Sequence, residues 1–531
     1  MNRTVLRTSA DIRSHTCAGG LALLALRMAT VYRPLAVLVT FALLRGVIYA
    51  TVLPVWDYND EEQHYHYAQH LAEERSLPIM GVTYISPEIV GSASASSRWE
   101  RLHLQRPEVI DSRQMGLEGY SYEAYQPPLY YAVLTLPYAL LKTAFGHETI
   151  VPGTSETLAM LYSLRLFTVV LCAISLVLAY LLFRRVLASR PDIVMIAATI
   201  LSLIPERTMA MSRVNNDVLL DLLSTAALLV LIGSTNRPPT TVTSLVLGVL
   251  VGLAMLAKLS AGIMIPMVLI FVAWQAARLR SFRHFLLNTF VVLASVAVIA
   301  GWFLARNFWL YGEVTGVSAF MRLAGFAPRY AFGEMSGALF EGIWTTRWSG
   351  VGSEAVGIFM ALVGLIAATG LVRKTVEVGL GKGRMETGNV EHILFLVAAA
   401  VLWLVPLLWG VRTGLVQHVE GRFLLPAYAP IVALLLAGLI YALPARASRI
   451  APIALAAFFA VVDAAYLIAF SLPYYYFQTS FEPALFFAGK PAFLNGAFVI
   501  TVGLGYIVAA AALCLELGAA CSRTLHGCAR L

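Results

Sequence analysis

The chain contains twelve long apolar runs, and these runs constrain its fold more than any other feature. A helix needs about 20 apolar residues to cross roughly 30 Å of hydrocarbon. The runs are continuous and rich in Leu, Ala and Val, whereas barrel strands alternate apolar and polar residues. We therefore predict an all-α, polytopic integral membrane protein with about 12 transmembrane helices. The runs lie at residues 35–53, 161–183, 193–211, 217–233, 242–257, 260–277, 285–304, 353–372, 393–411, 423–441, 450–472 and 494–518.

The composition supports a membrane protein and excludes several other classes. Hydrophobic residues make up 59% of the 531 residues and charged residues only 13%, whereas soluble domains are nearer 45–50% and 25%. This excludes a soluble enzyme, a disordered protein and a nucleic-acid binder. The net charge of +8 is attributed to basic loops that orient helices in a membrane. The five cysteines contain no CxxC pair, so they predict neither a disulfide framework nor a zinc knuckle.

The distribution of Lys and Arg predicts the orientation of the chain. If the N-terminus is cytoplasmic, twelve crossings place 20 of the 38 basic residues on the cytoplasmic side. Residues 129–145 are apolar but short and interrupted by Pro137. A crossing there would invert every later loop, so we predict an interfacial helix on the outer face. Both termini are then cytoplasmic, and the protein is a multi-pass protein of the cytoplasmic (inner) membrane.

This pattern divides the chain into three predicted regions. Residues 1–34 form a basic cytoplasmic N-terminus, and residues 35–441 form a transmembrane core. Residues 54–160 of that core form an outer-face loop after the first span. Residues 442–531 comprise the C-terminal transmembrane helices and a short cytoplasmic tail.

The outer-face loop carries the first candidate site. Its sequence VWDYNDEEQHYHYAQHLAEERSLP predicts a surface helix over 60–75, which places Asp60 and His64 on one face with Glu61 beside them. One carboxylate can act as a general base toward a hydroxyl, while its neighbour orients an acceptor or holds a divalent cation. Two alternatives stay open from spacing alone. The helix can be an ordinary solvated amphipathic helix, or its His and Glu residues can form a zinc site.

Several cations lie at the ends of spans on the same predicted face. Arg165 opens the second span, Lys258 lies between two spans, and Arg306 and Arg422 lie in further outer-face segments. A cation near hydrocarbon is costly and needs a partner. Lipid headgroups are the simpler partner, and a bound phosphate is the more specific one.

Two further acids lie inside the apolar runs, and several motifs are missing. Asp221 and Asp463 are either proton-relay groups or partners within the bundle. No GxxxxGK[ST] loop supports the use of ATP, and no internal repeat indicates a secondary transporter.

Taken together, these fragments resemble the GT-C superfamily of membrane glycosyltransferases, in particular bacterial dolichyl-phosphate-mannose-protein mannosyltransferase-like and aminoarabinose-transferase-like proteins. The resemblance runs in order from about residue 59 to 430. The segments that carry it are NDEEQHYHYAQHLAEERSLP, YQPPLYYAV, RLFTVVL, PERTMAMSRVNNDVLL, GLAMLAKLSAG, ARNFWLYGEVTG and EGRFLLPAYAP. One departure is Phe423, where many relatives have Tyr after the Gly-Arg pair.

The resemblance implies a reaction and a set of roles. Such enzymes pass a sugar from a polyprenyl-phosphate donor to a lipid, glycan or protein acceptor outside the cytoplasm, usually with inversion. By resemblance, Asp60 is the base and Glu61 positions the acceptor or a metal. The remaining candidates bind substrate or the leaving phosphate, namely Lys258, Arg306, Arg422, Arg165 and Gln126. No cofactor is certain, and His64 is the candidate helper for a divalent cation.

Two other functions compete with sugar transfer. A transporter or flippase of lipid-linked saccharides would place its polar residues near the middle of the membrane, reachable from both sides. A glycan ligase or polymerase would differ from a transferase in the size of its donor. The expected partners in all three cases are a lipid-linked saccharide and membrane lipid, and no nucleic acid is expected.

Overall fold

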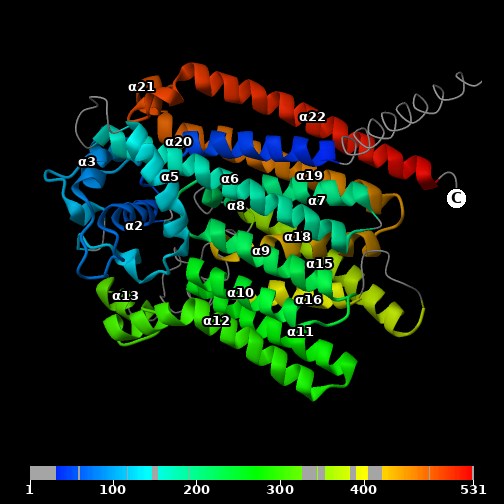
Figure 1. Cartoon of the computed structure of the whole chain (residues 1–531). Coiled ribbons are helices and arrows are strands. Elements are labelled where there is room, and N and C mark those ends of the chain that lie inside the picture. Colours follow the sequence, from blue (N-terminus) through cyan, green and yellow to red (C-terminus); the bar gives the residue numbers. More distant parts are fainter. Residues whose placement is uncertain are drawn as a thin grey trace, which may run out of the picture.

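A computed structural model of the chain describes most of the sequence and is entirely helical in its regular elements (Figure 1). The only β pairings in the described part are two isolated bridges, Tyr84 with Tyr120 and Phe477 with Phe481. The prediction of an all-α membrane protein is confirmed. The described residues are 32–57, 60–115, 118–145, 154–188, 190–325, 344, 353–382, 390–404, 421–477 and 479–528.

Within these residues, nine helices are long and apolar enough to cross a membrane, or ten if one bent pair counts as a span. Each of the twelve predicted runs contains helix, but α10 and α16 are shorter, so the count of about 12 is not confirmed. The nine spans are Tyr32–Val52, α6 (Thr154–Val186), α9 (Asp217–Ser234), α11 (Met264–Leu279, preceded by the 3₁₀ turn Leu259–Ile263), α12 (Phe282–Tyr311), α15 (Ser353–Gly379), α18 (Leu425–Ala442, preceded by the turn Gly421–Leu424), α19 to α20 (Ala447–Tyr476) and α22 (Gly496–Cys528). The shorter helices are α10 (Thr241–Ala257) and α16 (Val390–Leu402).

The bent pair consists of α7 (Pro191–Leu203) and α8 (Pro205–Met211), whose axes differ by 63°. The cause lies at the junction. Pro205 has no amide hydrogen, and its ring holds the preceding Ile204 in an extended conformation with φ −65° and ψ 115°. The break turns α8 beneath the outer-face loop, where it lies close to α9 and to the start of α18.

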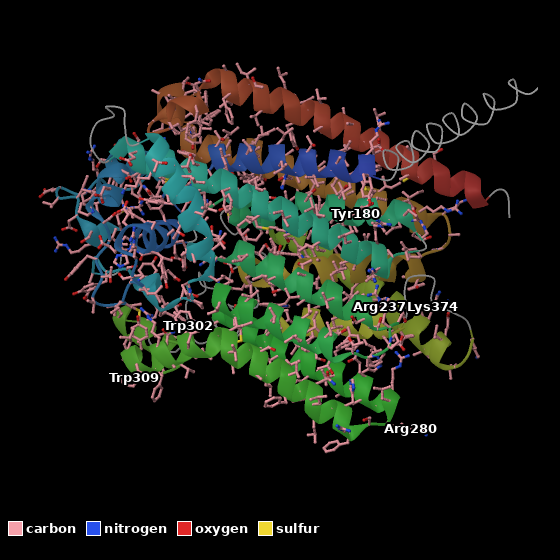
Figure 2. All side chains as sticks on the ribbon, in the orientation of Figure 1. Tyr180, Arg237, Arg280, Trp302, Trp309 and Lys374 are labelled. Atoms are coloured by element: carbon pink, nitrogen blue, oxygen red, sulfur yellow. The ribbon has the colours of Figure 1, made fainter. Side chains whose placement is uncertain are left out.

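The remaining helices lie mainly at one end of the bundle. Figure 1 shows α2, α3, α5, α13 and α21 at the end opposite to the C-terminus. These helices and the short turns between them are α2 (Glu61–Glu74), α3 (Pro87–Ala95), α4 (Arg98–Arg101), α5 (Leu129–Phe145), α13 (Val317–Leu323), α21 (Pro483–Phe487), Ser112–Gln114, Tyr122–Tyr125 and Ala492–Leu494. Figure 2 places Arg237, Arg280 and Lys374 toward the opposite end. The loop and the basic turns are therefore separated, although which side each faces stays a prediction.

Small residues allow two of the spans to pack closely. A Cβ atom on Gly438 of α18 would lie 2.2 Å from the carbonyl oxygen of Ala367 in α15, and one on Gly370 would lie 2.2 Å from the carbonyl oxygen of Gly438. Such contacts are typical of helices that associate by close backbone approach inside a membrane. They fix α15 against α18, and α18 follows directly from the segment that carries Arg422.

The two acids inside the spans are partners within the bundle. Arg45 of the first span donates through Nε to Asp463 of α19 at 2.7 Å, and Tyr49 also donates to Asp463. Asp221 of α9 accepts from Arg207 of α8 at 3.1 Å and from Ser175 of α6 at 2.5 Å. Buried charges in a membrane require such partners. These acids therefore connect helices that are distant in sequence.

The apolar segment before the second span forms the helix α5, as predicted. It packs against α2, α6 and α10. Leu136 and Leu140 remain 68% and 62% exposed on its outer side, and Pro137 lies within it. An exposed apolar face is expected of a helix in the membrane interface. Its interfacial position nevertheless stays a prediction.

Candidate functional site

The site is organised around the start of α2. The predicted helix over 60–75 is confirmed to within one residue at each end, because Asp60 and Arg75 are its caps. Asp60 has left-handed backbone dihedrals, φ 56° and ψ 32°, a region in which Asp and Asn are enriched. Most of α2 is buried, from Glu61 through Gln69 apart from Glu62. The interpretation of α2 as a solvated amphipathic helix is therefore wrong.

Asp60 forms an ion pair that closes the site across 362 residues of sequence. Arg422 donates to its Oδ2 at 3.1 Å, and the Tyr122 hydroxyl donates to its Oδ1 at 2.8 Å. Burial opposes ionisation of Asp60, but the charge of Arg422 and these two hydrogen bonds outweigh it and lower its pKa below the usual value. Its side chain remains 32% exposed. Asp60 is thus an accessible carboxylate that stays ionised at neutral pH.

Glu61, the next residue, is fully buried and serves a different purpose. Arg165 donates to its two carboxylate oxygens at 2.7 and 2.5 Å, and the amide of Val214 donates to it at 3.1 Å. Arg165 also donates to the carbonyls of Ala50, Leu53 and Pro54 at 2.8–2.9 Å. Both side chains of the ion pair are 0% exposed. Glu61 and Arg165 therefore join α2 to the end of the first span and to α6, with no surface left for a substrate.

A second brace lies next to this pair. Asp57 accepts a hydrogen bond from Arg213 at 3.1 Å and another from the Tyr475 hydroxyl at 2.8 Å. Tyr475 belongs to α20 (Leu472–Tyr476), so this contact connects the loop to the C-terminal helices. Asp57 is therefore anchored both by Arg213 and by α20.

Lys258 forms the second cationic part of the site. Lys258 is the single residue with an extended backbone between α10 and the turn Leu259–Ile263, and its Nζ is 2.6 Å from Oδ1 of Asp217. Oδ2 of Asp217 is buried and has no hydrogen-bond partner. The neighbouring Asn216 donates to the side-chain oxygen of Gln126 at 3.4 Å. The predicted residues Lys258 and Gln126 therefore both contact one short segment, Asn216–Asp217.

Electrostatic effects show that these groups surround a common region. Burial lowers the pKa of His64 to about 3, Asp60 partly offsets this, and Lys258 and Arg422 add to it. Burial also raises the pKa of Glu123 to about 8, with further influence from Asp60, Lys258 and Arg422. At neutral pH the His64 ring and the Glu123 carboxyl are therefore both uncharged. The structure joins Asp60 to Arg422 directly, and Lys258 acts on the same His64 and Glu123 side chains; their shared role in the site stays a prediction.

Arg306 lies outside this group. Its Nη2 donates to the carbonyl of Pro78 at 2.6 Å, and its charge acts on Tyr67. Tyr67 stacks on Tyr131 with ring centroids 3.8 Å apart, and Tyr131 bonds to His64. The hydrogen bonds of Arg306 that are described run to Pro78 and Asn307, and its predicted contact with phosphate stays a prediction.

The donor set at α2 does not fit a resident metal ion. Nδ1 of His64 lies 2.8 Å from the Tyr131 hydroxyl, and Asp60 is shared by Tyr122 and Arg422. Among the described residues no three His, Cys, Asp or Glu side chains are grouped as a metal site would require. The role of His64 as a metal helper has no support in this geometry.

Sequence reasoning missed two members of the site, Tyr122 and Glu123. Both belong to the turn Tyr122–Tyr125, within SYEAYQPPLYYAVL at the end of the outer-face loop. The Pro pair marks this stretch as extended and ordered before a helix. Nothing in the spacing shows that Glu123 is buried and lies within the electrostatic influence of Asp60, Lys258 and Arg422, because those residues come from distant parts of the chain.

Known proteins resemble this chain in part of its sequence and in its helical arrangement. Residues 159–302 match the family described as dolichyl-phosphate-mannose-protein mannosyltransferase. No curated protein sequence matches the chain. ArnT from Cupriavidus metallidurans bound to undecaprenyl phosphate aligns with a TM-score of 0.46 and 12% identity, over 91% of this chain and 77% of that protein.

Two other solved structures align less completely. The Archaeoglobus fulgidus oligosaccharyltransferase in complex with zinc and sulfate has a TM-score of 0.45 and 15% identity, over 81% of this chain and 53% of that protein. The arabinosyltransferase EmbB from Mycobacterium smegmatis has a TM-score of 0.41 and 10% identity, over 90% of this chain and 40% of that protein. This chain thus spans about half the length of the archaeal enzyme. With TM-scores below 0.5, these likenesses assign no residue and no substrate.

Proposed function

We propose that this chain transfers a sugar from a polyprenyl-phosphate donor to an acceptor. The premise is that it is a membrane glycosyltransferase of the GT-C superfamily, which the match of residues 159–302 supports. The acceptor is a lipid, a glycan or a protein. The reaction takes place at the end of the bundle that carries α2, on the extracytoplasmic side of the inner membrane. The observation that carries the proposal is the ion pair between Asp60 and Arg422, which lies within the electrostatic reach of Lys258 and His64.

Asp60 acts as the general base. Its lowered pKa keeps it ionised, and its 32% exposure makes it reachable by an acceptor hydroxyl. It removes the hydroxyl proton while the acceptor oxygen forms a bond to C1 of the sugar. The bond between C1 and the phosphate oxygen breaks, and polyprenyl phosphate leaves with the electron pair. Attack from the side opposite the phosphate inverts the configuration at C1.

Arg422 and Lys258 stabilise the phosphate that leaves. Arg422 offers a guanidinium that pairs with phosphate oxygens, and Lys258 offers a compact positive charge. In the structure each is paired with a carboxylate, Asp60 or Asp217. A donor phosphate that takes over Arg422 weakens its pull on Asp60, and this raises the pKa of Asp60. Binding of the donor therefore makes the carboxylate a stronger base when an acceptor needs it.

Glu61 and Arg165 take a positioning role in place of the predicted catalytic and phosphate-binding roles. Their bonds to each other and to three carbonyls of the first span consume their hydrogen-bonding groups. They hold the first turn of α2, so that Asp60 projects from a fixed point. Gln126 has a comparable place, because its side chain accepts from Asn216. Its direct contact with substrate stays a prediction.

A transporter of lipid-linked saccharides is the main alternative. Its substrate groups would lie near the middle of the membrane and be reachable from both sides. In this chain two acids buried within the described spans are paired with arginines, Asp463 with Arg45 and Asp221 with Arg207. The partly exposed Asp60 lies at one end of the bundle. This arrangement favours transfer, and it leaves a ligase or polymerase of larger glycans as a variant of the same reaction.

The test uses the purified chain in liposomes with radiolabelled polyprenyl-phosphate hexose and pentose donors. Release of polyprenyl phosphate is measured for wild type, Arg422→Gln and a control, Arg113→Gln. Arg113 pairs with Asp111 on the exposed surface of the same loop. Removing one group that stabilises developing charge costs about 10²–10³ in rate, so we expect that loss for Arg422→Gln and none for the control. If wild type moves the donors across the bilayer without cleaving them, the transporter alternative is correct.

A further inference from the structure

The far end of the bundle contains an apolar groove that the proposed reaction does not use. It has a volume of about 440 Å³ and lies between the first span, α7, α19 and α22. Its wall is almost entirely apolar, and Gly518 leaves part of it open, because a Cβ atom there would have no neighbour within 4 Å. Representative lining residues are Phe41, Ile196, Ala456, Leu513 and Gly518.

A basic pocket of about 310 Å³ adjoins this groove. Arg190, Asp192, Arg446 and Arg449 line it, and it shares Ile453 with the groove. Arg190 pairs with Asp192 at 2.8 Å, so their charges cancel. The guanidinium groups of Arg446 and Arg449 have no ion pair or hydrogen bond to any described residue, and both side chains are exposed. The pocket therefore carries two uncompensated positive charges at the mouth of an apolar channel.

This pocket is far from the Asp60 site. Arg449 lies in the first turn of α19, and the same span continues to Tyr475, which contacts the outer-face loop through Asp57. The 26 residues between Arg449 and Tyr475 correspond to about 40 Å at 1.5 Å per residue. A donor phosphate held by Arg422 therefore cannot also occupy this pocket.

We propose that the groove and its basic pocket bind an anionic glycerophospholipid. The phosphate and headgroup pair with Arg446 and Arg449, and one acyl chain lies along the apolar wall beside Gly518. Basic pockets between transmembrane helices are a recurring way of holding anionic headgroups, and an arginine fork suits phosphate oxygens. The charge pattern selects this occupant, because a zwitterionic lipid brings a positive group to two unpaired arginines.

The test compares lipid binding by native mass spectrometry of the full chain in detergent. Phosphatidylglycerol and phosphatidylcholine are titrated onto wild type, onto Arg446→Gln/Arg449→Gln, and onto Arg280→Gln/Arg283→Gln. Figure 2 shows Arg280 on the α11–α12 turn, away from α19 and α22. At about fivefold per arginine, the pocket variant should bind phosphatidylglycerol about 30-fold more weakly. The control carries the same change in charge and should bind like wild type.

A second variant tests the acyl-chain part separately. Gly518→Phe places a ring in the open part of the groove while leaving both arginines in place. It should also lose phosphatidylglycerol while retaining the thermal stability of wild type. The proposal is overturned if phosphatidylcholine binds as tightly as phosphatidylglycerol, if the control variant loses as much affinity, or if Gly518→Phe has no effect. It is equally overturned if inorganic phosphate at the concentration of the lipid displaces the lipid, because the groove would then contribute nothing.

Discussion

Changing Asp60 and Glu61 in turn to their amides distinguishes a catalytic role from a structural role at the start of α2. In Asp60→Asn the left-handed backbone is retained, since Asn adopts it readily. The Tyr122 hydroxyl can still donate to the amide oxygen. The ion pair that is lost is partly exposed, with Asp60 at 32%, so we expect less than about 1 kcal/mol of lost stability. The transfer rate should fall by about 10²–10⁴, the usual contribution of a general base.

In Glu61→Gln we expect the opposite result, a large loss of stability and a small loss of transfer rate. The amide oxygen still accepts from Arg165 and Val214, but the guanidinium is left as an uncompensated charge in a fully buried place. Breaking a buried ion pair on one side costs about 3–5 kcal/mol. We expect this loss in the free energy of unfolding. The rate per folded molecule should fall far less than in Asp60→Asn, because no group that meets the substrate has been removed.

Two measurements on the same preparations decide the matter. Thermal unfolding in detergent reports the stability of the folded chain, and single-turnover release of polyprenyl phosphate reports chemistry per folded molecule. Wild-type release by Asp60→Asn would remove Asp60 from the mechanism. Wild-type stability of Glu61→Gln would refute the role of Glu61 as the brace of α2. Equal losses in both assays for both variants would show that the two carboxylates act as one unit.

Two further predictions concern pH and sidedness. Glu123 has a pKa of about 8, so it gains a negative charge near the donor phosphate as pH rises through 8. The KM for the donor should then rise about tenfold, because the two negative charges repel each other. An equal rise of KM in Glu123→Gln would contradict this prediction. The sidedness test uses a cysteine-free background. Val109→Cys should react with an impermeant thiol reagent in intact cells, because this position in the outer-face loop is 66% exposed. Leu380→Cys, after α15, is at a position that is 65% exposed and should react only after permeabilisation. The reverse labelling would invert the topology.

The sequence predicted elements well where one local pattern decided the outcome. The helix at 61–74 followed from the helical spacing of its sequence, and it ends where Arg75 adopts a left-handed conformation. Each of the twelve apolar runs contains helix in its described part, but length decides whether a helix spans, and length depends on both termini. The break in the run at 193–211 had a visible cause in Pro205, whereas its angle depends on packing against α9 and α18.

The candidate site was predictable in its charges but not in their pairing. Sequence order could place Asp60 and Arg422 at the same end of the bundle, and the structure joins them. It could not show that Glu61 and Arg165 neutralise each other in a fully buried pair. Two acids adjacent in sequence look alike until the fold buries one and leaves the other accessible. Burial is a property of the whole assembly, and for that reason Glu123 was also missed.

The bonds of Glu61 and Asp60 imply an order of assembly during synthesis. Glu61 can pair with Arg165 once 104 further residues have been made, so the loop can be joined to α6 before most of the chain has been synthesised. Asp60 must wait for Arg422, 362 residues later. Until then its carboxylate lacks the cation that lowers its pKa. A nascent chain therefore carries an anchored but incomplete site, and a truncation before residue 422 inserts the loop without the means to use it.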